Sequence, residues 1–420
     1  MILLSESAKI RIEENALRKI DLNNFQVASS ETARDINSRI ILNLVRRHQP
    51  VSRADLMRFS GLQRSTVSVI TEELIKQQWL REGEIGRLPR GRRPTFLHLN
   101  ENRAGIFGVD IRPKTTNYAL ANMEGRFLVH ESFPTPSDPN EFVAQISRRI
   151  RDLIRTYPRL SYEGVGVSLP GRVEWPSQKI VFVPNLHWPE VDLKTLLEQK
   201  IGLPVDMENA ANACALSEFW FGRHSENLRD LAVLTVSEGI GVGMILNGQL
   251  VRGHSGLAGE FGHVAIVENG LKCGCGNHGC WEVYASNSAA LRYFNEARAG
   301  DIKQKTGNVN NGGAFSFEEL LKLFEQGDQK AREALERMAN YLGKGIAMLV
   351  TGLTPEQIVV VGEIARVWDQ LAPVVADVVR RCSFTHATTR ILSGNAADQP
   401  RLRGIIALIL QKRFGAPNVG

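Results

Sequence analysis

The sequence is poor in the features that would place a protein in a membrane or in an oxidising compartment. No run of apolar residues approaches the roughly 18 that a membrane-spanning helix needs. The first residues, MILLSESAKIRIEEN, lack the basic start and long apolar core of a secretory signal peptide. The 420 residues include only five cysteines, three of them clustered, which favours a reducing compartment over a disulfide framework. We therefore expect a cytoplasmic protein that does not enter a membrane.

The charge of the chain is unevenly distributed. Its apolar fraction of 43% and charged fraction of 23% are typical of a soluble globular protein, and its length predicts two or three domains. The net charge is +6, but Ile36 to Ala104 alone carries 13 Lys and Arg against 6 Asp and Glu, whereas the chain after it carries 33 of each. A basic excess confined to one short segment indicates a nucleic-acid partner.

That basic segment has the pattern of a small helical domain. After a polar arm, residues 1–35, apolar residues recur at helical spacing from Ile36 until Pro50 breaks the pattern. Ser52 is placed to cap a short second helix, a glycine turn follows, and a third helix runs from about Arg64 to Gln77. Two short strands around GRLPRGRRP complete a wing. The order of elements predicts a winged helix-turn-helix over residues 36–99.

The third helix and the wing supply the candidate DNA contacts. The N-terminal end of such a helix enters the major groove, where Arg and Gln read base edges and hydroxyl groups contact phosphates. Arginines of a wing can reach the minor groove or the backbone. The candidates are Gln63, Arg64, Ser65, Thr66, Ser68, Arg90, Arg92 and Arg93. Because such domains read paired half-sites, we expect a homodimer or homotetramer on an operator. A helical domain with a merely solvated basic face remains the alternative.

A glycine-rich segment in the second half of the chain has the spacing of a metal site. Cys273, Cys275 and Cys280 follow a C-x-C-x4-C pattern, and His263 precedes them. Three thiolates and one imidazole make a closed tetrahedral shell for zinc, so we expect one structural zinc ion per chain. His278 is an alternative fourth ligand, and three reduced cysteines without a metal are the plainer interpretation.

Two carboxylates flank this cluster. Glu260 lies just before the histidine, and Glu282 lies just after the last cysteine. A metal would fix both side chains relative to the His263 ring, and fixed carboxylates accept hydrogen bonds from the hydroxyls of a polyol ligand. The alternative is that both glutamates are simply solvated.

Strand and helix patterns alternate from Ile106 onwards, which predicts α/β layers. The order of strand, turn, strand and hairpin at residues 106–131 recurs at residues 231–251. A weak internal repeat of this kind is what a duplicated, two-lobed fold would leave.

The motifs G-x-x-G-x-A-G-E-x-G-H and C-x-C-G-x-x-G-C-x-E together resemble those of the ROK family, which contains bacterial sugar kinases and sugar-responsive transcriptional repressors. The resemblance extends from about Gly108 to the C-terminus. It implies a two-lobed, actin-like (ribonuclease H-like) fold over residues 104–420, with the C-terminal helix returning to the first lobe, and a structural zinc. It also implies sugar contacts from Asn209, Glu260, His263 and Glu282. The winged segment resembles the domain that ROK repressors carry ahead of this module.

The chain departs from the kinases of that family at the residues used for phosphotransfer. Where the kinases resemble D-x-G-G-T, this chain has Arg112 and Pro113 in place of the glycines. Proline lacks an amide hydrogen, and arginine is bulky where phosphates would lie. A second turn carries Glu238, and a third loses a glycine to Glu363. Ala210 stands where the kinases have the carboxylate that accepts the proton of the sugar hydroxyl.

These substitutions predict a protein that binds a sugar without phosphorylating it. Binding survives the loss of a catalytic base, because the base acts on the transition state. We expect a DNA-binding regulator, a repressor, that is controlled by a sugar or sugar derivative and is not an enzyme. The alternatives are a repressor controlled by a protein partner docking on the C-terminal module, and an active sugar kinase with an added helical domain.

Overall fold

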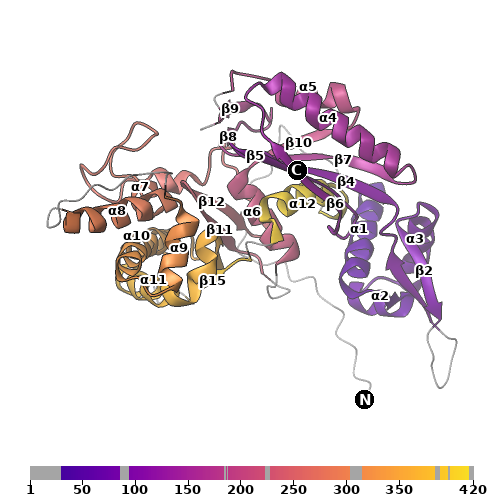
Figure 1. Ribbon diagram of the computed structural model, residues 1–420. Helices are drawn as coiled ribbons and strands as arrows, with labels where there is room; N and C mark the ends of the chain where they lie inside the picture. Colours follow the sequence, from indigo (N-terminus) through magenta and orange to yellow (C-terminus); the bar gives the residue numbers. More distant parts are fainter. Residues whose placement is uncertain are drawn as a thin grey trace, which may run out of the picture. The chain divides into compact units, whose positions relative to one another are not determined.

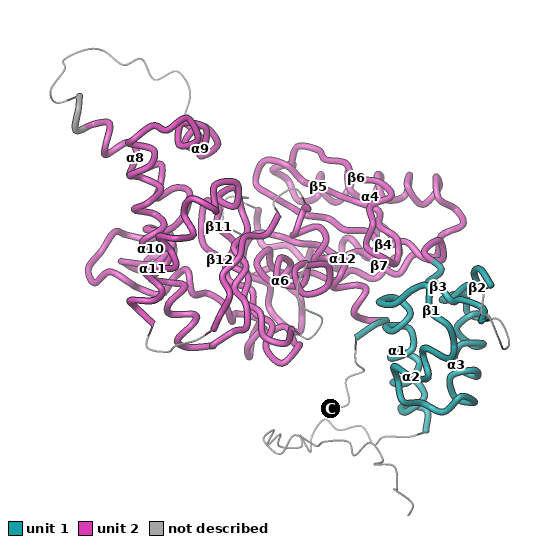
Figure 2. The backbone as a smooth tube through the Cα atoms, turned by 90° about the horizontal axis from the view of Figure 1, so that it is seen from below, with its two compact units in different colours: residues 1–100, 413–420 teal, residues 101–412 magenta. Residues whose placement is uncertain are grey.

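The computed structural model describes residues 30–85, 94–183, 186, 188–222, 228–302, 315–383, 388–395 and 398–415. The chain divides into two compact units, residues 1–100 together with 413–420, and residues 101–412 (Figure 2). Among the described helices, none combines the length and the apolar character that a membrane crossing requires.

In its described residues the first unit has three helices and a small antiparallel sheet, which Figure 1 shows. Its elements are α1 (Ser30–His48), β1 (Val51–Ser52), α2 (Arg53–Ser60), α3 (Arg64–Lys76), β2 (Leu80–Ile85) and β3 (Thr95–Leu99), and the sheet order is β1-β3-β2. Ser52 caps α2 as expected: its hydroxyl accepts the Asp55 amide at 3.2 Å, and its own amide donates to the Asp55 carboxylate at 3.1 Å. Gly61 ends α2 in the left-handed region, with φ of 71°. This arrangement fits a winged helix-turn-helix.

The first helix is longer than its apolar pattern indicates. We expected a polar arm through residue 35, but α1 already begins at Ser30. Charged pairs support the extra turn: Asp35 binds Arg39 one turn later at 3.0 Å, and Arg34 pairs with Glu73 of α3. Contacts between charged residues do not produce the apolar periodicity by which a helix is recognised in a sequence, so the pattern does not reveal this turn. Most of the expected wing lies outside the described residues, and with it the candidates Arg90, Arg92 and Arg93.

The second unit holds two five-stranded sheets with the same connectivity. The first has the order β10-β7-β4-β5-β6 and the second β13-β12-β11-β14-β15. In each, a central strand pairs antiparallel with the next strand of the chain and parallel with a later one. Their strands are β4 (Ala104–Asp110), β5 (Thr115–Ala121), β6 (Phe127–Pro134), β7 (Ser161–Leu169) and β10 (Val205–Asn209), and β11 (Leu231–Val236), β12 (Ile240–Leu246), β13 (Gln249–Leu250), β14 (Gln357–Gly362) and β15 (Arg390–Ser393). The expected duplicated α/β fold is confirmed.

Helices cover both sheets. The first sheet forms one core with α4 (Pro139–Thr156) and α5 (Leu193–Ile201). The second forms another core with α8 (Asn287–Ile302), α9 (Phe317–Glu325), α10 (Gln329–Leu353) and α11 (Trp368–Cys382). A third cluster joins α6 (Ala210–Phe221) to α12 (Pro400–Phe414). Shorter elements are β8 (Arg172–Val173), β9 (Ile180–Phe182), η1 (Glu260–His263), α7 (Glu282–Ala285) and η2 (Glu363–Val367).

Glycines allow α12 to approach its neighbours at backbone distance. A Cβ on Gly166 of β7 would lie 2.1 Å from the Ile405 side chain, and one on Gly404 would lie 1.6 Å from the carbonyl oxygen of Ala213 in α6. The C-terminal helix therefore packs on the first sheet. Its last two residues, however, group with the first unit.

Candidate functional site

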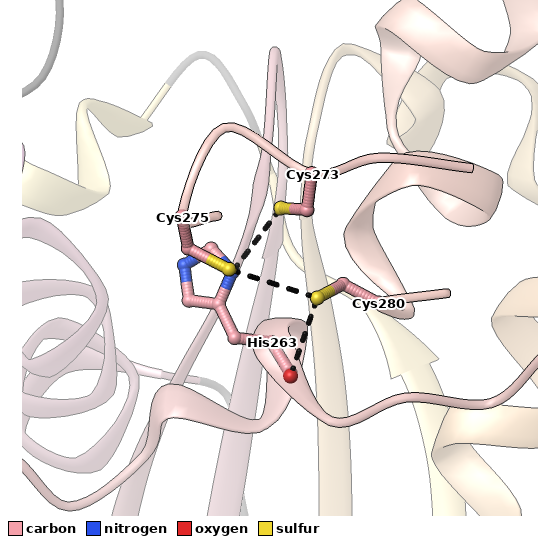
Figure 3. Close-up of side chains that lie close together, drawn as sticks. All are labelled: His263, Cys273, Cys275 and Cys280. Atoms are coloured by element: carbon pink, nitrogen blue, oxygen red, sulfur yellow. Dashed lines mark hydrogen bonds between the residues drawn. The ribbon is translucent and has the colours of Figure 1, made fainter. Parts of the chain in front are cut away.

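The predicted metal ligands come together in space. One ligand atom from each of His263, Cys273, Cys275 and Cys280 lies within 4.8 Å of the other three (Figure 3). His263 Nδ1 is 3.6 Å from Cys273 Sγ, and Cys275 Sγ is 3.7 Å from Cys280 Sγ. His278, the alternative fourth ligand, is not a member of this group. The arrangement could hold a metal ion.

The backbone of the cysteine loop holds the sulfurs in place. Gly276 and Gly279 have φ of 98° and 77°, in the left-handed region that glycine adopts without strain. A Cβ on Gly279 would lie 1.8 Å from the Val267 carbonyl oxygen, so only glycine fits the turn. Next to Cys280, the Trp281 ring is fully buried and donates to the Tyr341 carbonyl at 2.9 Å. The loop is thereby anchored on α10.

The chemistry of the donors also fits a metal. Burial raises the pKa of the Cys280 thiol to about 12, so this group stays protonated at neutral pH unless a cation takes the place of the proton. Three sulfurs and one imidazole at mutual distances below 4.8 Å are the donors of a closed tetrahedral site.

The histidine links this cluster to the first carboxylate. While Nδ1 of His263 faces the sulfurs, Nε2 lies 3.8 Å from Glu260 Oε2. A metal-binding histidine commonly presents its second nitrogen to a carboxylate, which orients the ring. The other Glu260 oxygen lies 3.4 Å from Nε of Arg172 in β8, shortly after β7 of the first sheet. Glu260 is therefore oriented from two sides, although its side chain is 39% exposed and accessible to a ligand.

The second carboxylate contacts one of the cysteines of the cluster. Glu282 Oε2 accepts the backbone amide of Ile240 at 3.1 Å, and its Oε1 lies 3.7 Å from Cys273 Sγ. A Cβ on Gly239 would lie 2.3 Å from Glu282 Oε2, so a larger residue at this position would displace the carboxylate. Both predicted sugar-binding carboxylates are thus connected through the metal ligands.

Asn209, the remaining predicted sugar residue, ends β10. Its side-chain oxygen accepts the amide of Asn212 at 2.8 Å and caps α6. The start of α6 packs against β12: a Cβ on Gly243 would lie 2.3 Å from the Ala211 carbonyl oxygen. Asn209 therefore comes from the first sheet, whereas the carboxylates lie between strands β13 and β14 of the second.

Sequence reasoning missed two arginines near these residues. Arg252 Nε donates to Glu208 at 2.8 Å, its guanidinium lies 4.2 Å from the centre of a Trp175 ring, and its buried Nη2 has no hydrogen-bond partner among the described residues. Arg172 pairs with Glu260 as described. Arg252 and Glu208 lie 44 positions apart, so no local sequence pattern predicts that they pair.

The turns that would hold nucleotide phosphates are charged. Asp110 is fully buried, and its Oδ2 accepts Nε of Arg112 at 2.7 Å, so an internal cation neutralises this carboxylate. On the second sheet, Val236 pairs with Gly362, which brings the turns carrying Glu238 and Glu363 to the same sheet edge. Burial and then Glu238 raise the pKa of Glu363, as expected where carboxylates gather. Neither sheet edge suits a polyphosphate.

The predicted DNA-contacting residues of α3 lie at its exposed N-terminal end. Gln63, Arg64 and Ser65 are exposed, and Thr66 and Ser68 are half-buried. The side chain of Gln63, at the N-cap of α3, makes no hydrogen bond to the first amides of the helix, and such amides can bind an anion. Val67, on the opposite face, is buried in the core of the unit. This face is therefore accessible to a partner.

Comparison with known proteins places the whole arrangement in a family. The family model of the ROK family matches residues 106–412. The xylose repressor of Bacillus spizizenii is 33% identical over 338 residues, 80% of this chain and 84% of that protein. A ROK family transcriptional regulator homologous to the E. coli MLC protein shares the fold with a TM-score of 0.77 and 24% identity, covering 91% of this chain and 98% of that one.

A ROK glucokinase from Streptomyces griseus, solved with glucose and AMPPNP, matches with a TM-score of 0.62 and 29% identity. That match covers 99% of the glucokinase but only 73% of this chain. Because the family model spans more than half of the sequence, and the cysteine cluster and its flanking carboxylates lie within the matched range, this chain belongs to the ROK family.

Proposed function

We propose that this chain is a DNA-binding transcriptional repressor whose ROK module binds a sugar and does not phosphorylate it. One contrast carries the proposal. Glu260, His263 and Glu282 are held in a connected arrangement around the cysteine cluster. In the first phosphate turn, by contrast, the side chain of Arg112 is hydrogen-bonded to Asp110. The proposed sugar-binding side chains are therefore oriented for a ligand, whereas the residues at the phosphotransfer positions are not arranged to bind phosphates.

The first unit would supply the DNA binding. Its three helices and small sheet fit a winged helix-turn-helix, and the exposed end of α3 presents Gln63, Arg64 and Ser65. The relative from Bacillus spizizenii is named a repressor. We propose a DNA-binding domain over residues 36–99, an N-terminal arm before it and the sugar-binding module over residues 104–420, assembled as a homodimer or homotetramer on an operator in the cytoplasm. Thr66, Ser68, Arg90, Arg92 and Arg93 complete the proposed DNA contacts.

The second unit would supply the sugar binding. Fixed carboxylates accept hydrogen bonds from vicinal hydroxyls, and Glu260 and Glu282 are both fixed. Asn209 would add a contact from the first sheet. Because the relative is named a xylose repressor, D-xylose is the first sugar to test. D-glucose, which the similar glucokinase binds, and N-acetylglucosamine, for which another similar repressor is named, follow. A thermal-shift screen of these sugars is the most direct test, since a ligand that binds only the folded state raises Tm.

The metal of the cluster would be zinc in a structural role. Cys3His is a donor set of closed structural zinc sites, and no ligand position remains for catalysis when four side chains bind. Zinc would keep the His263 ring, and through it Glu260, in position.

The alternative, a repressor controlled by a protein partner that docks on the C-terminal module, would have the same fold. Such a protein would not need the ordered carboxylates, so the arrangement of Glu260 and Glu282 favours the sugar. Calorimetric titration with the sugars named above separates the two functions.

The purified protein should contain about one zinc ion per chain. Cys275→Ala should remove the metal and lower the free energy of unfolding by more than about 2 kcal/mol, or Tm by about 5 °C, because metal binding and folding are coupled. Cys382→Ala, at another exposed cysteine, is the matched control and should change neither quantity. Metal analysis and thermal unfolding give the readouts; a metal-free parent, purified without chelators, would refute the zinc site.

No sugar phosphorylation should be detectable with ATP. Ala210→Asp, which restores the missing carboxylate, should also be inactive, because Arg112 still binds Asp110 and Glu238 still repels phosphates. A coupled assay of ADP release with D-xylose, D-glucose and N-acetylglucosamine measures this. ATP-dependent turnover of any of them by the parent would restore the kinase interpretation.

Arg64→Ala should relax the base preference of DNA binding at a cost of roughly 1–3 kcal/mol, as expected for loss of a bidentate base contact. Replacing Arg92 and Arg93 by alanine should instead weaken binding evenly across sequences and reduce its salt dependence. Arg380→Ala, an exposed arginine of α11, is the control. Operators selected from random DNA provide the assay, and an Arg64→Ala protein with unchanged preference would show that α3 is not the recognition helix.

Glu260→Ala should weaken sugar binding about tenfold to a hundredfold, the size of one or two hydrogen bonds to a charged group, and leave zinc content unchanged. Glu268→Ala, an exposed glutamate of the same loop, is the matched control and should bind as the parent does. His263→Ala should lose zinc, stability and sugar together, because one ring serves both roles.

Calorimetry with the sugar that stabilises the parent, together with metal analysis, separates these variants. If Glu260→Ala binds that sugar with the affinity of the parent, the ligand lies elsewhere in the chain.

A further inference from the structure

The C-terminal helix α12 belongs to both units of the chain. It runs without interruption from Pro400 to Phe414. Its residues up to Lys412 belong to the second unit, and those from Arg413 onwards belong to the first (Figure 2). The backbone therefore connects the two units twice, at residues 100–101 and within this helix.

The greater part of α12 is core of the second unit. Leu402 and Ile405 are fully buried, and Gly404 approaches the Ala213 carbonyl of α6 so closely that an added Cβ would lie 1.6 Å away. Lys412 forms an ion pair with Asp206 of β10. Helix α6 begins directly after Asn209, a proposed sugar contact. Displacement of α6 would therefore press directly on α12, because no side chain lies between them at the glycine.

The last turn of α12 is equally well integrated into the first unit. Phe414 is only 3% exposed, and its carbonyl accepts Nδ2 of Asn43 at 2.6 Å. The carbonyl of Gly415 accepts Nη1 of Arg39 at 2.9 Å, and the Arg46 guanidinium lies 5.5 Å from the centre of the Phe414 ring. Residues 39, 43 and 46 share one face of α1, so this face is built around the end of α12.

Helix electrostatics explain why this face carries cations. The last carbonyls of a helix have no partner within it, and they form the negative end of its dipole. Asn43 satisfies the carbonyl of Phe414, the last residue of the helix, and Arg39 satisfies that of Gly415, which follows it. Arg46 adds positive charge beside the ring. Arg413 in turn lies over the Trp79 ring at 5.4 Å. The last turn thus has its terminal carbonyls bound by hydrogen bonds and positive charge beside its negative end. The apolar Phe414 ring lies at the centre of the contact.

We propose that α12 transmits the sugar-dependent state of the module to the DNA-binding unit through this capped last turn. The inference rests on the proposed function, since it concerns how the sugar changes DNA affinity. Sugar contact at Asn209 acts on α6, α6 acts on α12 at Gly404, and the end of α12 acts on α1 through Phe414. Phe414 is a positioning residue in this scheme and touches neither sugar nor DNA.

Hydrogen–deuterium exchange of the full chain, without sugar or DNA, tests the docking of the last turn. In Phe414→Ala the amides of α1 should exchange about tenfold faster or more, because the apolar centre of the contact is lost. Phe414→Leu, which keeps an apolar side chain, should stay near the parent, and the amides of β4 and β7 should not change in either variant. Unchanged exchange of α1 in Phe414→Ala would overturn the proposal.

Interruption of the helix tests transmission. Two glycines inserted between Lys412 and Arg413 leave both packed parts of α12 intact but uncouple them. With D-xylose as the probe, the parent should change its operator affinity by about 5–150-fold, the usual range of coupling between two sites. The insertion variant should change by less than about twofold, while its operator affinity without sugar and its calorimetric affinity for D-xylose stay within about threefold of the parent.

The matched control places the same two glycines between Gln326 and Gly327, where a Cβ on the glycine would meet nothing within 4 Å; this variant should respond like the parent. An α12 insertion variant that keeps the full response contradicts transmission through this helix. A parent whose operator affinity responds to none of D-xylose, D-glucose and N-acetylglucosamine contradicts the proposed function and the transmission that rests on it. In that case the exchange experiment still decides whether the last turn is part of the first unit.

Discussion

The second unit depends on backbone contacts that only glycine permits. From β7 to α12 the contact is at Gly166, from α12 to α6 at Gly404, and from α6 to β12 at Gly243. At each position a Cβ would lie within 2.3 Å of a neighbouring atom. The two sheets are therefore joined through two helices whose backbones approach their neighbours closely at these glycines. A close-packed interior of this kind shifts as a whole instead of deforming locally. A ligand that touches residues following both sheets can act on this stack.

The cysteine cluster orients the residues that we propose to bind the sugar. His263 turns one nitrogen to the sulfurs and the other to Glu260, while Glu282 bridges the Ile240 amide and Cys273. Two carboxylates that would otherwise explore many rotamers are held by the same four-residue cluster. Less conformational entropy is then lost when hydroxyls bind, which is the general advantage of a preorganised site.

Much of this was accessible from the sequence because the patterns were local. The capping of α2 by Ser52, the cysteine spacing and the repeated strand order each lie within a short window, and the structure contains all three. Helix α6 has no helical period in the sequence, because it is apolar on most sides and is packed between β12 and α12. The ion pair of Arg252 with Glu208 joins residues 44 positions apart, and the hydrogen bond of Asn43 in α1 to the Phe414 carbonyl joins residues 371 positions apart. Only the folded chain brings such residues together.

The altered phosphate turns suit a sensor for a physical reason. A kinase consumes its sugar, so the occupancy of its site depends on turnover as well as on concentration. With Arg112 bound to Asp110 and Ala210 in place of a base, the sugar leaves unchanged, and occupancy follows its concentration at equilibrium. Such a ligand shifts a conformational equilibrium only by its differential affinity for the two states, and moving a population from 1:99 to 99:1 takes about 10⁴-fold. Asn209 follows the first sheet whereas Glu260 follows strands of the second, so a sugar held by both would bind differently whenever the two sheets shift.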